Sequence, residues 1–213
     1  MGENIVLPAI LTNSREDFKK QFNCLNGISK WIQVDIMDGM YTDSTSIGLD
    51  DLEGIESKSN VEAHLMVIDP EEYLDDLKRL GFKRVIFQFD ASEDPWEVLE
   101  KGHDLGMEMG LALNPCIDVE AMEEHMDDID IAMLMSVFPG AQGQEFIPDT
   151  IDRVADMREL MDEKKVSVDG GIKTDNIQEI VNAGADHICI GSAITSHEDP
   201  ASAWRNLHDK VNS

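Results

Sequence analysis

Long hydrophobic runs are missing from this sequence. No apolar stretch reaches the roughly 18 residues that a bilayer-spanning helix requires, and no basic segment followed by an apolar one opens the chain as a secretory leader would. Cysteine is also scarce: Cys24, Cys116 and Cys189 are far apart and form no CxxC pair. We therefore predict a cytoplasmic protein without membrane contact and without a disulfide framework, whose thiols are reduced and lie in the core.

Positive charge is scarce as well. The chain has 17 basic and 44 acidic residues, which gives a formal net charge of −27. Such a surface repels nucleic acid and anionic lipid, so neither is expected as a partner. The acids are spread along the chain, which is typical of solvated helix faces. Because salt screens self-repulsion between like charges, we hypothesise that the protein works in a salt-rich cytoplasm.

Linkers rich in proline or glycine are absent, so residues 1–213 are interpreted as a single domain. Short apolar runs, mostly β-branched or aromatic, recur along this domain and are typical of strands that are buried on both faces. These runs are Ile5–Ile10, Trp31–Ile36, Val61–Met66, Arg84–Phe89, Glu108–Leu113, Ile131–Met135, Val166–Asp169 and His187–Ile190.

Helical patterns alternate with these runs. They are Ser14–Asn26, a short pattern near Gly48–Ile55, Pro70–Leu80, Asp94–Gly106, Asp118–Met126, Pro148–Asp162, Thr174–Ala183 and Asp199–Val211. Strict alternation predicts a parallel sheet of the α/β class, and eight units in 213 residues match the short end of the closed (β/α)8 TIM-barrel range. The main alternative is an open doubly wound sheet, but the turn Pro8–Asn13 lacks the glycines usual in that fold.

Polar residues at the ends of strands are the candidates for chemistry, because a barrel of this kind places its active site there. Alternation brings Gln33 and Asp35 to one side of their strand. A lone buried carboxylate is costly, so we predict that Asp35 is functional and has a partner or a metal. Asp38 is interpreted as a turn residue. His64, taken alone, is more typical of a satisfied core residue than of a ligand.

Small residues follow the last two strand runs. Gly170 and Gly171 let the backbone approach a ligand, and a helix that begins near Thr174 would offer free amides to an anion. Gly191–Ala193 forms a second small turn, and loops in these two places commonly hold phosphate, which we prefer to simple tight turns. The loop that contains Gly140 and Gly143 can fold over a ligand. No GxGxxG or GxxxxGK[ST] nucleotide signature occurs.

Several runs occur in the order and at the spacing of the ribulose-phosphate 3-epimerase family, which the chain resembles along nearly its whole length. They are Val34–Gly39, His64–Val67, Leu113–Pro115, Met135–Val137 with Pro139 and Gly140, Gly143 and Gln144 with Phe146, Val168–Ile172 and Gly191–Ala193. Together these runs are highly specific for the family, although no single one is.

The resemblance implies an isomerase of carbohydrate metabolism that interconverts D-ribulose 5-phosphate and D-xylulose 5-phosphate. Two aspartates, here Asp35 and Asp169, would act as catalytic acid and base on opposite faces of C3. It also implies a divalent metal (zinc, manganese, magnesium or iron) that stabilises an enediolate. The implied ligands are Asp35, His64, Asp169 and, weakly, Gln33. The family further implies a dimer or hexamer.

Two further groups of residues are implied in the same way. An apolar pocket around the reacting carbons would consist of Met37, Met66 and Met135. The sugar phosphate would be bound by His64, Gly140, Ala141, Gln142, Gly143, Gly170, Gly171, Gly191 and Ser192.

Four positions depart from the family pattern. Gln33 stands where the family has a histidine ligand, and Ala9 stands where it has a serine. Met40 and Tyr41 replace a His-Phe pair, and Gln142 replaces the first glycine of a pair. A glutamine carbonyl is a poorer zinc donor than imidazole. One alternative is therefore a sugar-phosphate-binding barrel with a weakened or lost metal site and altered or no epimerase activity. We prefer the epimerase, because acid–base chemistry depends on placed carboxylates more than on any single metal donor.

Related decarboxylases and synthases of this barrel superfamily place a lysine in the acidic motif of the second strand. Ile36 and Met37 stand there instead, so these activities rank below the other two.

Overall fold

Eight parallel strands form a closed barrel in the computed structural model, which describes residues 4–212. Each strand pairs with its neighbours in sequence order, and β8 closes the barrel against β1. The strands are β1 Ile5–Ile10, β2 Trp31–Met37, β3 Asn60–Met66, β4 Arg84–Gln88, β5 Glu108–Leu113, β6 Ile131–Met135, β7 Lys165–Asp169 and β8 His187–Ile190. The predicted (β/α)8 barrel is confirmed, and the predicted strand bounds agree to within one residue.

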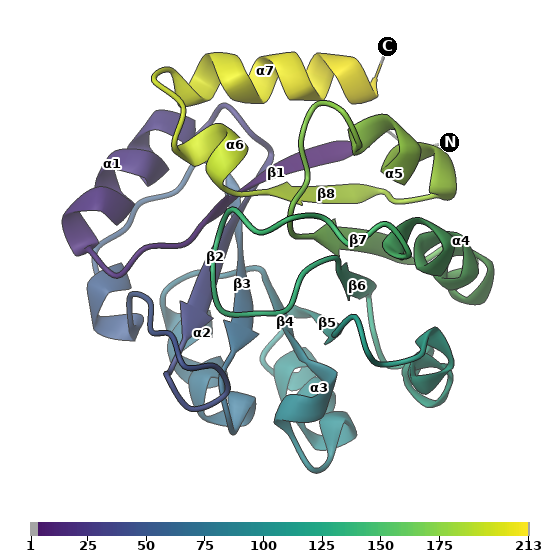
Figure 1. Cartoon of the computed structure of the whole chain (residues 1–213). Helices are drawn as coiled ribbons and strands as arrows, with labels where there is room; N and C mark the ends of the chain where they lie inside the picture. Colours follow the sequence, from purple (N-terminus) through teal and green to yellow (C-terminus); the bar gives the residue numbers. More distant parts are fainter. Residues whose placement is uncertain (1–3, 213) are drawn as a thin grey trace.

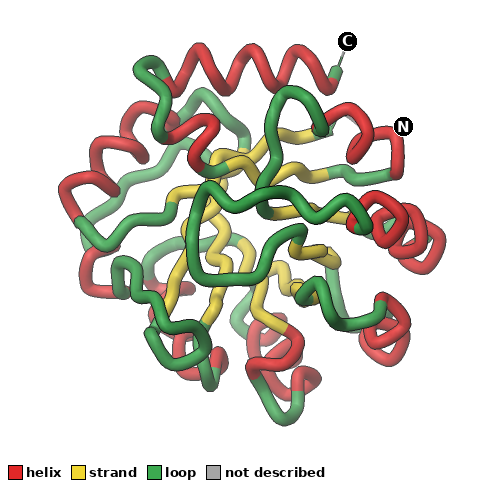
Figure 2. Tube along the Cα trace, viewed as in Figure 1, coloured by secondary structure: helices red, strands yellow, loops and turns green. Residues whose placement is uncertain are grey.

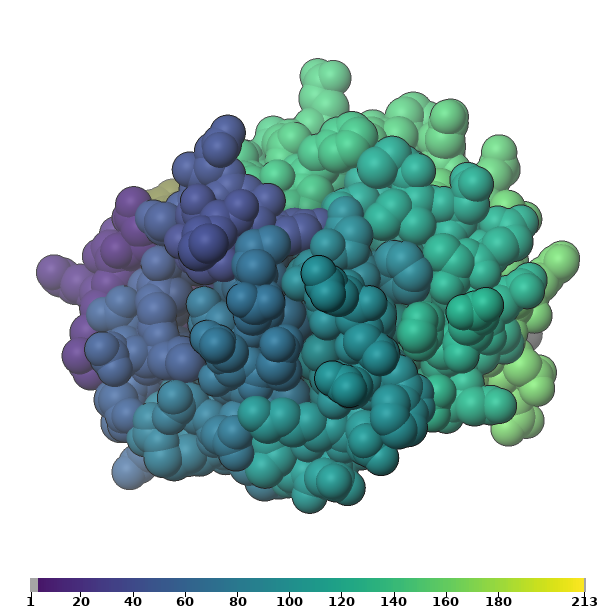
Figure 3. Space-filling model, turned by 90° about the horizontal axis from the view of Figure 1, so that it is seen from below, coloured from purple at the N-terminus to yellow at the C-terminus, as the bar shows by residue number. Residues whose placement is uncertain are grey.

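Helices surround this barrel as an outer ring (Figures 1 and 2). The α-helices are α1 Arg15–Leu25, α2 Leu74–Arg79, α3 Pro95–Asp104, α4 Thr150–Met161, α5 Ile177–Ala183, α6 Ser192–Thr195 and α7 Pro200–Val211. Short 3-10 helices are η1 Leu49–Leu52, η2 Pro70–Tyr73, η3 Phe89–Ala91 and η4 Val119–His125. Along one side of the molecule the units follow each other in sequence order, as the colours of Figure 3 show.

Capping explains where several of these helices begin. The Ser14 hydroxyl accepts a hydrogen bond from the backbone N–H of Asp17, as predicted for the start of α1. Asp94 and Asp199 cap α3 and α7 in the same way, and each is followed by a proline at the first helical position.

Three helix predictions were wrong in type or bounds. The pattern Pro70–Leu80 divides into η2 and α2: unlike Asp94 and Asp199, the preceding Asp69 gives no side-chain cap and has a φ of +53°, and 3-10 turns are frequent at helix starts. The pattern Asp118–Met126 is the 3-10 helix η4, which has no side-chain cap and ends among acids that oppose the helix dipole. The helix expected from Thr174 is α5, which begins only at Ile177. There the Asn176 side chain bonds the backbone of Gly171 and Lys173 and holds the preceding residues in a turn.

Apolar side chains fill two layers on either side of the strands. A large cluster lies between the strands and the helices, and a smaller one fills the barrel interior with residues such as Leu7, Ile86 and Met133. Of the cysteines, Cys189 belongs to the interior cluster. The prediction of core thiols was wrong for Cys24 and Cys116, which are exposed on α1 and in the loop after β5.

An ion-pair cluster occupies the end of the barrel where the strands begin, with Arg84 and Glu62 buried and Glu108 exposed. Arg84 Nη1 lies 2.8 Å from Glu62 Oε2, and Arg84 Nη2 lies 2.6 Å from Glu108 Oε2. The guanidinium also packs 3.9 Å from the centre of the Trp31 ring. Burial raises the pKa of Glu62, which the charge of Arg84 opposes. Among residues 4–212, none of the helices combines the length and apolar character needed to cross a bilayer.

Added salt is expected to stabilise this fold. Screening weakens repulsion among the surface acids that give the chain its formal charge of −27. We expect the melting temperature to rise as potassium chloride approaches molar concentration, by about 2–4 °C for each kcal/mol gained. Differential scanning calorimetry in a potassium chloride series measures this shift. A melting temperature that stays flat or falls would rule out a salt-adapted surface.

Candidate active site

A cavity opens at the end of the barrel where the strands finish. Its wall contains the following residues singled out from the sequence: Asp35, His64, Met66, Met135, Gly140, Ala141, Gln142, Gly143, Asp169, Gly170, Gly171, Gly191 and Ser192. Gln33 is fully buried and bonds to the two aspartates of the wall. Met37 does not belong to the cavity wall, and its sulfur accepts a hydrogen bond from the Thr42 hydroxyl.

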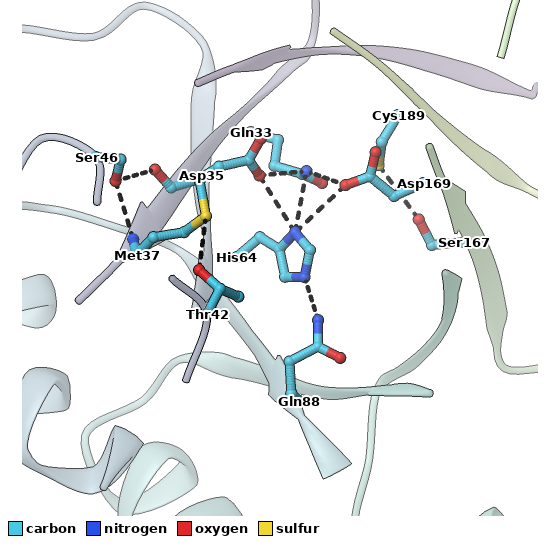
Figure 4. A network of polar contacts seen from close by, with 10 residues as sticks. All are labelled: Gln33, Asp35, Met37, Thr42, Ser46, His64, Gln88, Ser167, Asp169 and Cys189. Carbon is cyan, nitrogen blue, oxygen red and sulfur yellow. Dashed lines mark hydrogen bonds and ion pairs between the residues drawn. The ribbon is translucent and has the colours of Figure 1, made fainter. Parts of the chain in front are cut away.

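Asp35 and Asp169 approach one point from opposite sides of the barrel interior (Figure 4). Asp35 is on β2 directly opposite His64 on β3, and Asp169 ends β7. The Nδ1 atom of His64 lies 3.2 Å from Asp35 Oδ1 and 3.3 Å from Asp169 Oδ2. His64 therefore does not sit in the core as an isolated satisfied side chain but joins the two carboxylates.

The Gln33 amide bridges the same two oxygens. Its Nε2 donates to Asp35 Oδ1 at 2.8 Å and to Asp169 Oδ2 at 2.7 Å. Its Oε1 is buried and has no hydrogen-bond partner. Two carboxylate oxygens require a donor between them, so the nitrogen faces them and the carbonyl oxygen is left over. Gln33 thus lies between the two aspartates, with its amide nitrogen facing the carboxylates.

Electrostatics in this cluster follow from burial and proximity. Burial raises the pKa of Asp35, and the charge of Asp169 raises it further, while the hydrogen bond from His64 opposes both. Burial lowers the pKa of His64, but hydrogen bonds and charges from Asp169 and Asp35 outweigh it and raise the pKa to about 10. Burial and the nearby Asp169 raise the pKa of the Cys189 thiol, so this thiol stays neutral and unreactive.

The donor atoms fit a divalent cation. One ligand atom each from Asp35, His64 and Asp169 lie within 4.8 Å of one another. Two carboxylate oxygens and one imidazole nitrogen suit manganese, iron or zinc, and the orphaned Gln33 oxygen is a further donor within the same cluster. The cluster can therefore either bind a divalent ion or satisfy itself through the Gln33 amide.

The paired glycines at the end of β7 are required by packing. Gly170 and Gly171 have φ values of +114° and +59°. A β-carbon at Gly170 would lie 2.5 Å from the Val137 side chain, and one at Gly171 would lie 2.5 Å from the backbone nitrogen of Phe146. The predicted reason for these glycines, close approach to a ligand, is thus incomplete, because the loop after β6 already presses on them. That loop forms one wall of the cavity.

Asp38 holds two loops in place, as the turn interpretation predicted. Its Oδ1 accepts hydrogen bonds from the backbone N–H groups of Met40 and Tyr41, and its Oδ2 accepts one from Ile68. The Tyr41 hydroxyl in turn donates to Asp90 at 2.6 Å. These contacts tie the loop after β2 to the segments that follow β3 and β4.

Sequence reasoning missed two polar residues at the site. Lys173 is the one lysine or arginine in the cavity wall, it is exposed, and no ion pair of its side chain is found within residues 4–212. Gln88 is fully buried at the end of β4, with its Nε2 atom 2.8 Å from His64 Nε2. Both could have been noticed in the sequence. Lys173 is a basic residue beside a glycine pair in an acidic chain, and Gln88 is an amide within an apolar strand run.

Comparisons with known proteins match most of the chain to one family. The model of the "Ribulose-phosphate 3 epimerase family" matches residues 5–195. Proteins named ribulose-phosphate 3-epimerase are similar over most of the chain. The one from Escherichia coli K12 is 35% identical over 85% of this chain and 82% of its own length. The one from Synechocystis is 32% identical over 95% and 93%, and the one from Schizosaccharomyces pombe is 29% identical over 97% and 93%.

Similar solved structures show the same fold at low sequence identity. Orotidine 5'-phosphate decarboxylase from Pyrococcus horikoshii OT3 superposes with a TM-score of 0.73 at 16% identity, covering 98% of this chain and 100% of the other. A 3-hexulose-6-phosphate synthase gives 0.73 at 17% identity, with 96% and 98% covered. At these identities the likeness concerns the barrel alone.

Proposed function

We propose that this chain, which belongs to the ribulose-phosphate 3-epimerase family, interconverts D-ribulose 5-phosphate and D-xylulose 5-phosphate by inverting C3. One observation carries the proposal. Asp35 and Asp169 come from β2 and β7 and meet at the base of the cavity, with one atom each of Gln33 and His64 between them. Inversion at carbon needs an acid and a base on opposite faces, and this pair supplies both.

In the proposed reaction, one aspartate removes the C3 proton from one face and the other delivers a proton to the opposite face. Which of the two acts as the base depends on which epimer is bound, because the C3 proton lies on opposite faces in the two sugars. In the reverse direction the two residues exchange roles. Met66 and Met135 line the cavity and would exclude water from the reacting carbons.

Asp35, His64 and Asp169 would hold a divalent ion, and Gln33 could add its carbonyl oxygen if the amide turned. When bound, such an ion supplies positive charge that stabilises an oxyanion. Hard oxygen donors favour manganese or magnesium over zinc, and the site would bind zinc less tightly than one with a second imidazole. The residues Gln33 and His64 would also hold the two carboxylates in place before substrate binds.

The phosphate would lie against the backbone of Gly170, Gly171, Gly191 and Ser192, under the loop that contains Gln142. Lys173 supports this assignment, because it is the one lysine or arginine in the wall of this cavity. An anionic substrate approaching a chain with a net charge of −27 needs local positive charge, which Lys173 supplies.

Replacing Lys173 with glutamine is expected to weaken substrate binding about fivefold, the loss typical of one partly exposed charge pair. The KM should rise, kcat should change little, and the dependence of kcat/KM on salt should become shallower. Steady-state kinetics at several ionic strengths measure all three. Lys20→Gln on the exposed face of α1 removes the same charge far from the cavity and is the control. Equal kinetics for both variants would exclude Lys173 from the phosphate site.

One observation favours a second candidate function, a sugar-phosphate-binding barrel without epimerase activity. The two hydrogen bonds from Gln33 satisfy both aspartates in the place where the family's metal is implied. Incubating D-ribulose 5-phosphate with the protein, with and without manganese, and measuring D-xylulose 5-phosphate distinguishes the two. Binding of the sugar phosphate without product in either condition supports the second candidate. A dimer or hexamer and a cytoplasmic location stay predictions.

A further inference from the structure

Nε2 is the ring nitrogen of His64 that points away from the two aspartates. Within residues 4–212, Gln88 is the one residue with a side-chain hydrogen-bond contact to this nitrogen. It ends β4, next to β3, and its side chain is fully buried. Its Nε2 lies 2.8 Å from His64 Nε2, and its Oε1 is buried without a hydrogen-bond partner. Figure 4 shows the histidine ring between this amide on one side and Gln33 with the two aspartates on the other.

A nitrogen–nitrogen contact of this length contains a single hydrogen atom. With the Gln88 amide nitrogen facing the ring, Gln88 donates and His64 Nε2 carries no hydrogen. This is the arrangement of a neutral ring; the charged ring, which the two carboxylates favour by raising the His64 pKa, has a hydrogen on Nε2 as well and needs the Gln88 amide turned. In the neutral ring the proton sits on Nδ1 and points at Asp35 and Asp169, 3.2 and 3.3 Å away. A histidine in this tautomer cannot offer Nδ1 to a cation, because that lone pair is used by the proton.

Metal binding through Nδ1 requires the opposite arrangement. The ring hydrogen must lie on Nε2, and Nε2 then needs an acceptor in a fully buried place. Gln88 can provide one by turning its amide so that the orphaned Oε1 faces the ring. Gln33 would make the equivalent turn if its orphaned Oε1 were to face a cation, so both unpartnered amide oxygens would gain a partner in a site that holds a metal.

We propose that Gln88 is a positioning residue that determines which nitrogen of His64 carries the ring hydrogen and so sets the affinity of the site for divalent cations. The inference rests on the metal site of the proposed function. Glutamine permits both tautomers, because its amide can either donate or accept. A carboxylate at this position can only accept and selects the metal-binding tautomer, whereas a thioether neither donates nor accepts well.

The test compares zinc and manganese affinities of the whole protein with Gln88, Gln88→Glu and Gln88→Met, measured by calorimetry without sugar. We expect affinity to increase in the order Met, Gln, Glu, with about tenfold between neighbours, as for other groups that orient a metal-binding histidine. Gln178→Glu on the exposed face of α5 adds the same charge away from the site and should leave affinity unchanged. Equal affinities, no binding to any of the proteins, or weakening by Glu as well as Met would overturn the inference.

The tautomer itself gives a readout that a purely structural role would not move. Nitrogen-15 spectra of the metal-free proteins should show a larger share of His64 rings with the hydrogen on Nε2 in Gln88→Glu than in the wild type, and a smaller share in Gln88→Met. The same distribution in the wild type and Gln88→Met would overturn the inference, even if Gln88→Glu fails to fold. These measurements need no substrate, so they can fail independently of the proposed function. If the protein is an active epimerase and substitutions of Gln88 leave its metal affinity unchanged, only the role of Gln88 is contradicted.

Discussion

Asparagine in place of either Asp35 or Asp169 is expected to lower the rate of C3 epimerisation by about 10²- to 10⁴-fold, the usual contribution of a general acid or base. Asparagine keeps the size of the side chain but can neither remove nor deliver a proton at ordinary pH. The two losses should be similar in size, because each turnover uses both residues, one on each face of C3. Interconversion of the two sugar phosphates in both directions measures the effect.

The control for this pair is Asp50→Asn, which removes a carboxylate from an exposed position in η1. Its activity should match that of the wild type. That result would show that the loss of one negative charge does not by itself lower the rate of epimerisation. The melting temperatures of all three variants establish that the barrel still folds. If Asp35→Asn or Asp169→Asn keeps activity within about tenfold of the wild type, the assignment of that residue as acid or base is wrong.

Gln33→His is expected to tighten zinc binding by at least about tenfold. The substitution replaces an amide, whose nitrogen now bridges the two aspartates, by a second imidazole beside His64. Two carboxylates and two imidazoles form a closed set of four ligands of the kind that zinc prefers. Competition against a zinc chelator at fixed pH measures the dissociation constant for both proteins.

Gln33→Met is the matched control, since it removes the bridging amide without adding a metal donor of comparable strength. It should weaken zinc binding or leave it unchanged, and it should destabilise the fold, because Asp35 and Asp169 lose a shared hydrogen-bond donor. If Gln33→His has the zinc affinity of the wild type, the Gln33 side chain does not face the ion and the metal site is wrongly assigned.

The strands could be predicted closely because each is a continuous apolar run, and a barrel buried on both faces imposes that pattern directly. Alternation also placed Gln33 and Asp35 on the same side of β2, where the structure joins them by a hydrogen bond. Helix ends were less predictable. The start of α5 depends on bonds from the Asn176 side chain to residues upstream of it, which no periodic pattern reports.

The site itself was only partly readable from the sequence. Gln88 is an amide within an apolar run, and its importance appears only when β3 and β4 lie side by side and bring it against His64. The paired glycines at 170 and 171 were noticed, but the Phe146 backbone that requires Gly171 is 25 residues away in the chain. Contacts of this kind depend on the closed barrel, so a local pattern can mark the residue but cannot identify its partner.

Exchange of the C3 proton of D-ribulose 5-phosphate in deuterated water tests the central claim most directly. Proton nuclear magnetic resonance follows the C3 signal in the presence of the wild-type protein, with manganese added in one series and a chelator in another. The account predicts loss of the C3 proton signal together with the appearance of D-xylulose 5-phosphate deuterated at C3. A protein that binds the sugar phosphate in both series, yet leaves the C3 proton in place, would contradict the epimerase and support a binding barrel.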